Sequence, residues 1–308
     1  MKISDIIRSG SAPFPSLEIV PPLTGIGKEQ LLESIAPLME FKPRYINVTT
    51  HRDEFRFEPQ PDGTYIRRVV RNRVSAVAVC AAIQSQYKVE VVPHLICGGT
   101  SAHETEALLQ DFKFLGIENV MALRGDSLLG EKRFTPAPDG YAHASELVAA
   151  IRRFEQENGG DFCIGVGAYP EKHFEAANLE TDIRFLKRKV DAGADVIITQ
   201  MFFDNAVFYR FVEKCRAAGI TVPIIPGLKP LSSRNQVFSL PETFSIDIPL
   251  ELTEAILSTG DDKEKAFRIG TDWCIAQCRD LLGHGVPAIH FYTMTKARNI
   301  IEILRACF

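Results

Sequence analysis

Charged side chains stand where short apolar runs end in this chain, most clearly in the stretch Val120–Asp126. The run Val120–Leu123 predicts a buried strand, which ends where Arg124, Gly125 and Asp126 begin. Glycine allows a sharp turn at that point because it has no Cβ atom to clash. The sequence therefore presents an arginine and a carboxylate side by side at one strand end, where they could act on a bound ligand.

Other apolar runs end in the same way, in polar residues able to do chemistry. In chain order these residues are Glu18, Thr49, Thr50, His51, His94, Arg124, Asp126, Tyr169, Glu171, Gln200, Lys229, Tyr292 and Thr293. Each has an ordinary structural interpretation, such as a hydrogen-bonded core histidine for His94 or a salt bridge to Arg124 for Asp126. A convergent ring of polar residues at one mouth is harder to explain by structure alone.

Several familiar site motifs are absent from the sequence. There is no Walker phosphate loop, no HExxH and no GxSxG, and the stretch 165–167 lacks the third glycine of a dinucleotide fingerprint. Glu18, His94, Asp126 and Glu171 could be imagined around a metal ion, but no spacing supports such a site, and we expect no metal.

The overall composition narrows the class of protein. The length of 308 residues exceeds the roughly 250 of a typical (β/α)8 barrel and lies within the range of that fold. A net charge of -4 and a pI near 6.0 argue against a nucleic-acid surface, and the basic stretch Arg67–Arg73 is interpreted as a helix face. Seven scattered cysteines, no signal-peptide core and no apolar run of about 18 residues indicate a cytoplasmic protein with reduced thiols and no membrane span.

Eight apolar, β-branched runs alternate with helical patterns. The runs are Leu17–Val20, Tyr45–Thr50, Val89–Ile96, Asn119–Leu123, Phe162–Ala168, Val196–Gln200, Val222–Ile225 and Ala288–Tyr292. Parallel strands are buried on both faces and need crossover helices, which is the pattern seen here. We therefore predict an α/β fold, a (β/α)8 TIM barrel, with a doubly wound open sheet as the alternative.

The remaining segments complete this prediction. A short helix over Met1–Arg8 opens the chain, and a helix is expected over Lys28–Glu40. Arg52–Gly63 reads as a polar loop, followed by a helix marked by Val70, Val74, Val77 and Ala81. Two or three extra helices occupy residues 232–282 between the seventh and eighth strands, and a final helix covers 295–306.

The strand ends also carry a family resemblance that runs nearly from end to end. Its landmarks are Glu18 before Pro21-Pro22, the stretches 47–49, 93–95, 122–126, 168–171, 186–194, 198–200 and 225–227, and His290-Phe291-Tyr292-Thr293. Together and in order, these resemble the catalytic barrel of methylenetetrahydrofolate reductases of the bacterial type. The resemblance implies a single catalytic domain over residues 1–308, without the C-terminal regulatory domain of the eukaryotic members.

The resemblance implies a flavoprotein oxidoreductase of one-carbon metabolism. NADH or NADPH would reduce a noncovalent FAD and leave, in a ping-pong reaction. 5,10-Methylenetetrahydrofolate would then take the hydride and give 5-methyltetrahydrofolate for methionine biosynthesis. The family forms dimers and tetramers, so a homo-oligomer is expected, while the preferred nicotinamide stays open.

Site residues follow from the resemblance, position by position. Glu18 would be the general acid, because its apolar neighbours favour a protonated carboxyl, and Asp126 would stabilise the developing folate cation. Substrate contacts would come from Asp126, Gln200, Gln236 and Lys296. FAD contacts would come from Thr49, His94, Arg124, Gly125, Asp126, Ala144, Tyr169, His173, Asp182, Arg188 and Lys189.

The sequence also departs from the family pattern. Lys296 stands where the best-known bacterial members have an arginine, Leu240 where they have a phenylalanine and Phe185 where they have an asparagine. These departures bear on ligand affinity and on the choice of nicotinamide. Two other functions stay open: a flavin-free lyase or aldolase barrel that uses Lys229 or Lys296 as a Schiff base, and a non-catalytic pterin-binding relative.

Overall fold

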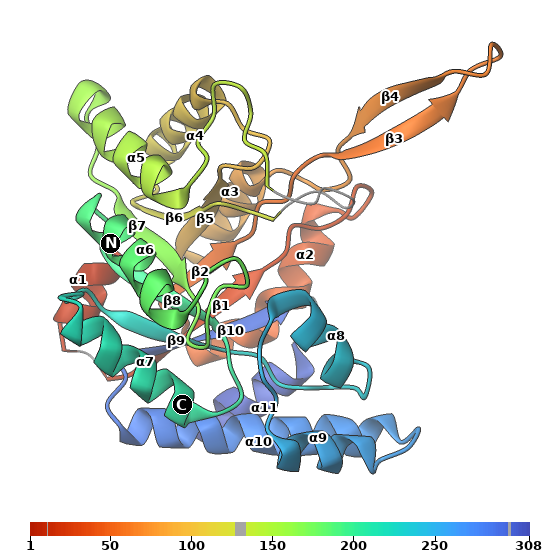
Figure 1. Cartoon of the computed structure of the whole chain (residues 1–308), viewed down its shortest axis with the longest axis vertical. Coiled ribbons are helices and arrows are strands. Elements are labelled where there is room, and N and C mark those ends of the chain that lie inside the picture. The colour runs from red at the N-terminus through yellow and green to blue at the C-terminus, as the bar shows by residue number, and fades with distance from the viewer. Residues whose placement is uncertain (11, 127–133, 295–296) are drawn as a thin grey trace.

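Eight parallel strands close into a barrel in the computed structural model, which describes residues 1–10, 12–126, 134–294 and 297–308 (Figure 1). The strands run in the order β1-β10-β9-β8-β7-β6-β5-β2. Their bounds are β1 Phe14–Ile19, β2 Tyr45–Val48, β5 Glu90–Ile96, β6 Asn119–Leu123, β7 Cys163–Ala168, β8 Val196–Met201, β9 Ile224–Leu228 and β10 Ala288–Met294. The predicted α/β TIM barrel is confirmed, and the open sheet is excluded.

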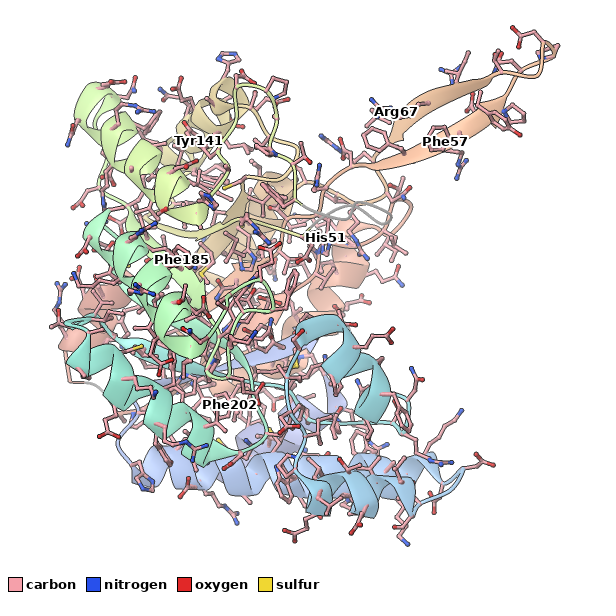
Figure 2. All side chains as sticks on the ribbon, viewed as in Figure 1. His51, Phe57, Arg67, Tyr141, Phe185 and Phe202 are labelled. Atoms are coloured by element: carbon pink, nitrogen blue, oxygen red, sulfur yellow. The ribbon has the colours of Figure 1, made fainter. Side chains whose placement is uncertain are left out.

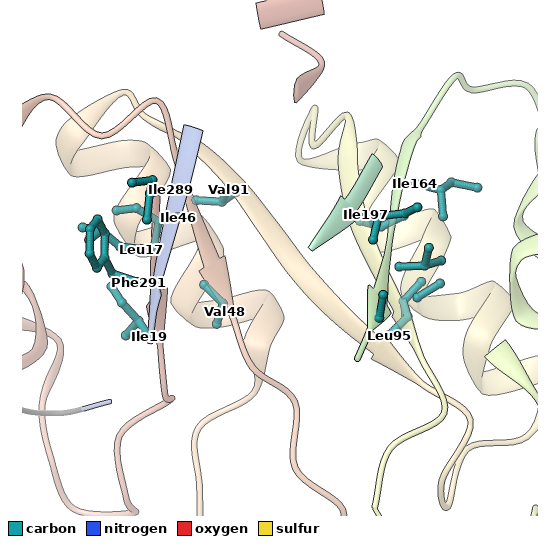
Figure 3. Packing of buried hydrophobic residues seen from close by; sticks show 14 of the residues in the cluster. Leu17, Ile19, Ile46, Val48, Val91, Leu95, Ile164, Ile197, Ile289 and Phe291 are labelled. Atoms are coloured by element: carbon teal, nitrogen blue, oxygen red, sulfur yellow. The ribbon is translucent and has the colours of Figure 1, made fainter. Parts of the chain in front are cut away.

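Alternation along the strands decides which side chains can reach the interior of the barrel. On β1, Leu17 and Ile19 belong to the large core cluster between strands and helices, so Ser16 and Glu18 face the other way. On β10, Ile289 and Phe291 belong to the same cluster, which leaves His290 and Tyr292 on the inner side. Figure 3 shows Leu17, Ile19, Ile289 and Phe291 packed together. Burial of the apolar side chains between the strands and the helices thus directs the alternate, polar side chains into the barrel interior.

Helices surround the barrel on its outside (Figure 1). Those that follow barrel strands are α2 Lys28–Ile35, α3 Ala76–Tyr87, α4 Ala102–Phe114, α5 Ala144–Asn158, α6 Leu179–Asp191, α7 Asn205–Ala217 and α11 Arg298–Cys307. Three helices lie between β9 and β10, as predicted: α8 Gln236–Phe244, α9 Leu250–Leu257 and α10 Lys263–Gly283. Within the described residues, no helix is both long and apolar enough to cross a membrane.

The short helix α1 (Ile3–Arg8) covers the amino-terminal ends of the strands. Its Ile3 and Ile6 are buried in one cluster with strand residues such as Phe14 and Val92. The Ile3 N–H donates to Asn119 Oδ1 at 2.8 Å, which fixes the helix to the start of β6. This end of the barrel is therefore closed by side chains, and the carboxyl ends of the strands form the opposite mouth.

One region contradicts the sequence prediction. Residues 54–70 form an antiparallel hairpin, β3 (Glu54–Pro59) and β4 (Tyr65–Val70), which projects away from the barrel in Figure 1. The polar loop predicted over 52–63 and the helix-face interpretation of Arg67–Arg73 were therefore wrong. The helix predicted from Val70, Val74, Val77 and Ala81 does form, but it begins only at Ala76. The alternating side chains over 54–58, followed by Pro61-Asp62-Gly63, were the missed signal, since such a tripeptide favours a tight turn.

Two smaller corrections have local causes. The helix predicted over Lys28–Glu40 ends at Ile35 and continues as a 3-10 helix over Ala36–Phe41, because Pro37 has no N–H to donate to an α-helical bond. The seventh strand begins at Ile224 and continues through Pro226 and Gly227 to Leu228. The predicted strand Val222–Ile225 thus ended too early, because Pro226 and Gly227 belong to β9.

Candidate active site

A carboxylate and two imidazoles meet at the carboxyl end of the barrel interior. Glu18 Oε2 lies 3.7 Å from His94 Nε2 and 3.7 Å from His290 Nε2. Strand pairing brings them together: β1 lies between β10 and β2, and β2 pairs with β5, which carries His94. Both histidines are buried and Glu18 is nearly so. Of these three, sequence analysis predicted Glu18 and His94 as site residues.

His290 was missed as a site residue. It appeared in the sequence only as part of the stretch 290–293, although its place two residues before Tyr292 on an alternating strand puts both on the inner side. Ser16 Oγ lies 3.0 Å from His290 Nδ1, and Asn47 Oδ1 lies 3.3 Å from His94 Nε2. These contacts hold both rings in place around the Glu18 carboxyl.

The pKa of Glu18 is shifted in the direction opposite to the one expected from the sequence. Burial by itself would raise the pKa of Glu18, but the contact with His290 and the electrostatic interactions with His94, His290 and Lys229 outweigh it, and the pKa is lowered. The sequence argument considered burial alone, and its direction was wrong. Burial lowers the pKa of His94 to about 4, so that ring is neutral at pH 7. Burial also lowers the pKa of Lys229, against the attraction of Glu18.

Close packing of β8, β9 and β10 supports the cluster from the side. The Tyr292 hydroxyl donates to the Thr199 carbonyl at 2.6 Å, and the Gly227 N–H donates to Thr199 Oγ1 at 3.0 Å. A Cβ atom at Gly227 would overlap the Thr199 carbonyl and lie 2.7 Å from the Tyr292 ring. Only glycine fits this position, because the backbone and the tyrosine already occupy the space.

The stretch after β6 forms part of the rim. Arg124 makes an ion pair with Glu175, and its guanidinium lies 5.0 Å from the Phe134 ring centroid. Among the described residues, the salt bridge between Asp126 and Arg124 considered from the sequence is not formed, and Asp126 is exposed. Gly125 has a φ of 81°, a conformation that glycine adopts without strain. The backbone conformation at Gly125 is thus one that glycine allows, and it stands between a half-buried Arg124 and an exposed Asp126.

Beside it, the β7 end and helix α6 gather aromatic and charged groups. The Tyr169 and His173 rings meet edge to face at 4.7 Å, and the His173 backbone N–H donates to Asp182 Oδ2 at 2.8 Å. Lys189 Nζ donates to the Gly167 carbonyl at 2.9 Å. Burial lowers the pKa of Lys189 and outweighs the attraction of Asp182. This half-buried ammonium group thus donates to an acceptor that carries no charge.

Farther along α6, an aromatic and a guanidinium group lie open to solvent. The Arg188 guanidinium lies 5.2 Å from the Phe185 ring centroid, and Phe185 is 45% exposed (Figure 2). Ala144 is the buried first residue of the neighbouring helix α5. The departure at Phe185 therefore supplies a flat apolar surface where the family pattern has an amide.

The two glutamines predicted to contact folate, Gln200 and Gln236, have different surroundings. Gln200 Oε1 accepts the Met201 N–H at 2.9 Å, and the side chain lines a small hollow with Tyr169 and Glu171. Gln236 Oε1 accepts the Ser232 N–H at 2.6 Å and so holds the turn before α8.

Three further positions complete the sequence prediction. Thr49 Oγ1 lies 3.0 Å from His51 Nε2, directly after β2. Leu240 is buried on α8. Lys296 lies outside the described residues.

The described residues contain no group of His, Cys, Asp and Glu side chains suited to a metal ion. They do fit a diphosphate-bearing aromatic cofactor such as FAD. Lys189 is a half-buried cation whose hydrogen-bond partner carries no charge, and an anionic phosphate would stabilise it. Arg124 shares this region, and Tyr169 with His173 supplies ring faces and hydrogen-bonding groups.

Comparison with known proteins decides the family. A family model described as "Methylenetetrahydrofolate reductase" matches residues 2–307. The chain belongs to the methylenetetrahydrofolate reductase family. The resemblance inferred from the strand-end motifs is thereby confirmed over nearly the whole chain.

Named relatives of this reductase family agree. The 5,10-methylenetetrahydrofolate reductase of Escherichia coli is 33% identical over 282 residues, 92% of this chain and 86% of that protein. Methylenetetrahydrofolate reductase (NADH) 1 of Arabidopsis thaliana is 32% identical over 312 residues, 98% of this chain but 49% of that protein. The chain thus spans about half the length of several curated relatives and most of the bacterial ones.

Solved structures agree on the fold. A Clostridium thermocellum protein described as binding two copies of 5-methyl-5,6,7,8-tetrahydrofolic acid superposes with a TM-score of 0.60 at 15% identity, over 98% of this chain and 97% of that one. A 2,3-dimethylmalate lyase gives 0.50 at 11% identity, over 98% of this chain and 82% of that one. At these identities the likeness extends to the barrel alone.

Proposed function

We propose that this protein reduces 5,10-methylenetetrahydrofolate to 5-methyltetrahydrofolate with NADH or NADPH, through bound FAD. The observation that carries the proposal is the cluster of Glu18, His94 and His290 at the mouth of a barrel of the reductase family. Relatives named for NADH and for NADPH are both similar to this chain, so the nicotinamide stays open. The product would supply methyl groups for methionine biosynthesis.

Glu18 would deliver the proton that opens the five-membered ring of the folate. In the structure its pKa is lowered, so it is ionised at neutral pH before ligands bind. A folate covering the mouth would remove water from the carboxyl, and desolvation favours the protonated form. His290 and His94 would hold the carboxyl of Glu18 at a fixed orientation. His94, with its pKa lowered to about 4, would do so as a neutral ring.

Lys189, Arg124 and Arg188 would hold the FAD phosphates and adenosine, with Thr49, His94, Gly125, Asp126, Ala144, Tyr169, His173 and Asp182 as the further contacts. When bound, FAD would accept a hydride from the nicotinamide and pass it to the folate. Arg124 would leave Glu175 to reach a phosphate, because it cannot serve both anions fully. The exposed Phe185 ring would offer a stacking surface for a planar group such as adenine.

The folate would be oriented by Asp126, Gln200, Gln236 and Lys296. Asp126 is exposed at the rim, where it can approach a pterin, and its charge would stabilise the iminium cation formed on ring opening. Gln200 offers a donor and an acceptor on one amide, which suits a pterin edge. Its Nε2 atom can serve the ligand while Oε1 accepts the Met201 N–H.

An anaerobic visible spectrum of the purified protein with FAD tests the proposal. The flavin absorbance should bleach on addition of NADH or NADPH and return on addition of 5,10-methylenetetrahydrofolate. Bleaching without return would leave a flavin reductase with another acceptor. Failure to bind FAD would refute the proposal.

Lys229 favours one alternative, a lysine-dependent lyase. It directly follows β9 at the mouth, and burial lowers its pKa, as a Schiff-base amine requires. Borohydride trapping of a carbonyl substrate on Lys229 would support that function. Its electrostatic contact with Glu18 equally suits a role in holding the Glu18 charge.

A further inference from the structure

The hairpin β3–β4 has no covering element among the described residues, yet it carries large apolar side chains. Phe57 is 63% exposed, Tyr65 67%, Val69 63% and Phe55 39%. The register pairs Phe55 with Val69, Phe57 with Arg67 and Pro59 with Tyr65, so these residues share one face. Arg67, on the same face, lies over the Phe55 ring at 4.3 Å. An isolated two-stranded hairpin is marginally stable in water, and this one exposes an apolar face as well.

Both outer edges of this hairpin are also unpaired within the part of the chain that the structure describes. The Gln60 N–H donates to the Thr64 carbonyl, so even-numbered β3 residues bond across the hairpin and the odd-numbered ones, Phe55 and Phe57, point their backbone groups outward. An outward edge of this kind is a template for pairing with another strand.

The charge pattern of β3 fits a second copy of the same strand. In an antiparallel pair centred on Phe57, Arg56 lies opposite Glu58 of the second copy, and this contact occurs twice by symmetry. Shifting the centre to Arg56 would place Arg56 against Arg56 of the second copy. The β4 edge is unsuitable, because a pair centred on Arg67 would oppose two arginines. Charge therefore favours the β3 edge. Of the two centres on β3 that bring opposite charges together, Phe55 and Phe57, only Phe57 lets residues 55–59 of both strands pair.

We propose that the hairpin is a dimerisation arm, in which β3 pairs antiparallel with β3 of a second copy about Phe57. The result is a continuous four-stranded sheet, β4-β3 of one copy joined to β3-β4 of the other. Phe57 faces Phe57, and Phe55 lies beside Pro59 of the second copy on the apolar face. Pro59 has no N–H, which costs one backbone bond at each end of the pair and leaves the central pair intact.

Charge reversal tests whether β3 pairs with β3 of a second copy and whether Arg56 then faces Glu58. Arg56→Glu would bring two carboxylates together at each contact, and Glu58→Arg would bring two arginines together, so each variant should repel itself. A mixture of the two variants restores opposite charges at both contacts. The double variant Arg56→Glu/Glu58→Arg also restores them. It moves the acidic partner of Arg68 from position 58, where Glu58 accepts from Arg68 at 2.5 Å, to position 56, directly opposite Arg68.

Sedimentation velocity of the full chain gives the readout. We expect each single variant to raise the dissociation constant of this step by about tenfold or more, and the equimolar mixture and the double variant to return it to near the wild-type value. Matching circular dichroism and melting temperature show that the variants are folded. A wild-type monomer at 100 µM (about the upper end of such measurements), single variants that associate like the wild type, or a mixture that stays dissociated would each overturn the proposal.

Discussion

Glu171 offers a pH test of the packing between the β7 end and the segment after α8. Its Oε2 accepts the Asp247 N–H at 3.0 Å, while burial and the charges of Asp247 and Asp204 raise its pKa to about 7. The carboxyl of the unfolded chain titrates near 4.5. The folded state therefore binds more protons between pH 4.5 and about 7, and folding stability falls as pH rises through that window.

The size of the effect follows from the pKa difference. Each pKa unit corresponds to about 1.36 kcal/mol, which sets an upper limit of roughly 3.4 kcal/mol. Glu171 is only half-buried, and solvent screening reduces this to about 1–2 kcal/mol. Glu171→Gln removes the titration and keeps an oxygen for the Asp247 N–H. The variant should match the wild type near pH 5 and exceed its unfolding free energy by about 1–2 kcal/mol at pH 8.

Urea unfolding at pH 5, 6, 7 and 8 (a series of about one-unit steps) measures this difference. Glu242→Gln, an exposed carboxylate change on the nearby helix α8, serves as the control and should run parallel to the wild type at every pH. If Glu171→Gln also ran parallel to the wild type, the buried position of this carboxyl would be misjudged.

Three further changes test the site. Glu18→Gln should slow folate reduction by about 100-fold or more and leave flavin reduction by the nicotinamide within a few fold, as measured by stopped-flow absorbance; equal loss in both half-reactions would contradict the general-acid role. Lys189→Met should weaken FAD binding by roughly 10- to 100-fold in a fluorescence titration, and unchanged affinity would remove Lys189 from the phosphate site. Gly227→Ala should lower the unfolding free energy by about 1–3 kcal/mol in urea, because the added methyl group has no space beside Thr199 and Tyr292; a stability equal to wild type would show that the strands yield easily.

The barrel was predictable because its signal is local. Runs such as Val196–Gln200 and Asn119–Leu123 are continuous, apolar and β-branched, and each is followed by a helical pattern, so strand positions held to within about three residues. The hairpin was not found, because Phe55 and Phe57 alternate with charged residues in a segment without the continuous apolar character of buried strands. Its prolines drew attention to loops, whereas Pro59 stands at an outward edge position that tolerates it.

The sequence was enough to name Glu18 and His94 as site residues, but it was not enough to predict the direction of the pKa shift at Glu18. The strand ends named Glu18 and His94, since the carboxyl ends of barrel strands must meet. The sign of the pKa shift at Glu18 depends on His290 and Lys229, which come from strands more than 200 residues away along the chain. Sequence neighbours report burial, but they carry no information on such distant charges.

Helix α1 closes one end of the barrel, and this has a kinetic consequence for the proposed reaction. The nicotinamide and the folate would have to approach the same side chains from the same side, so neither could bind while the other is in place. The nicotinamide would then be the substrate of the first step and an inhibitor of the second, and the folate would be the substrate of the second step and an inhibitor of the first. Raising either concentration far above its optimum should slow turnover, and relief should come from raising the other. The form of the rate law would thus be set by a six-residue helix far from the chemistry.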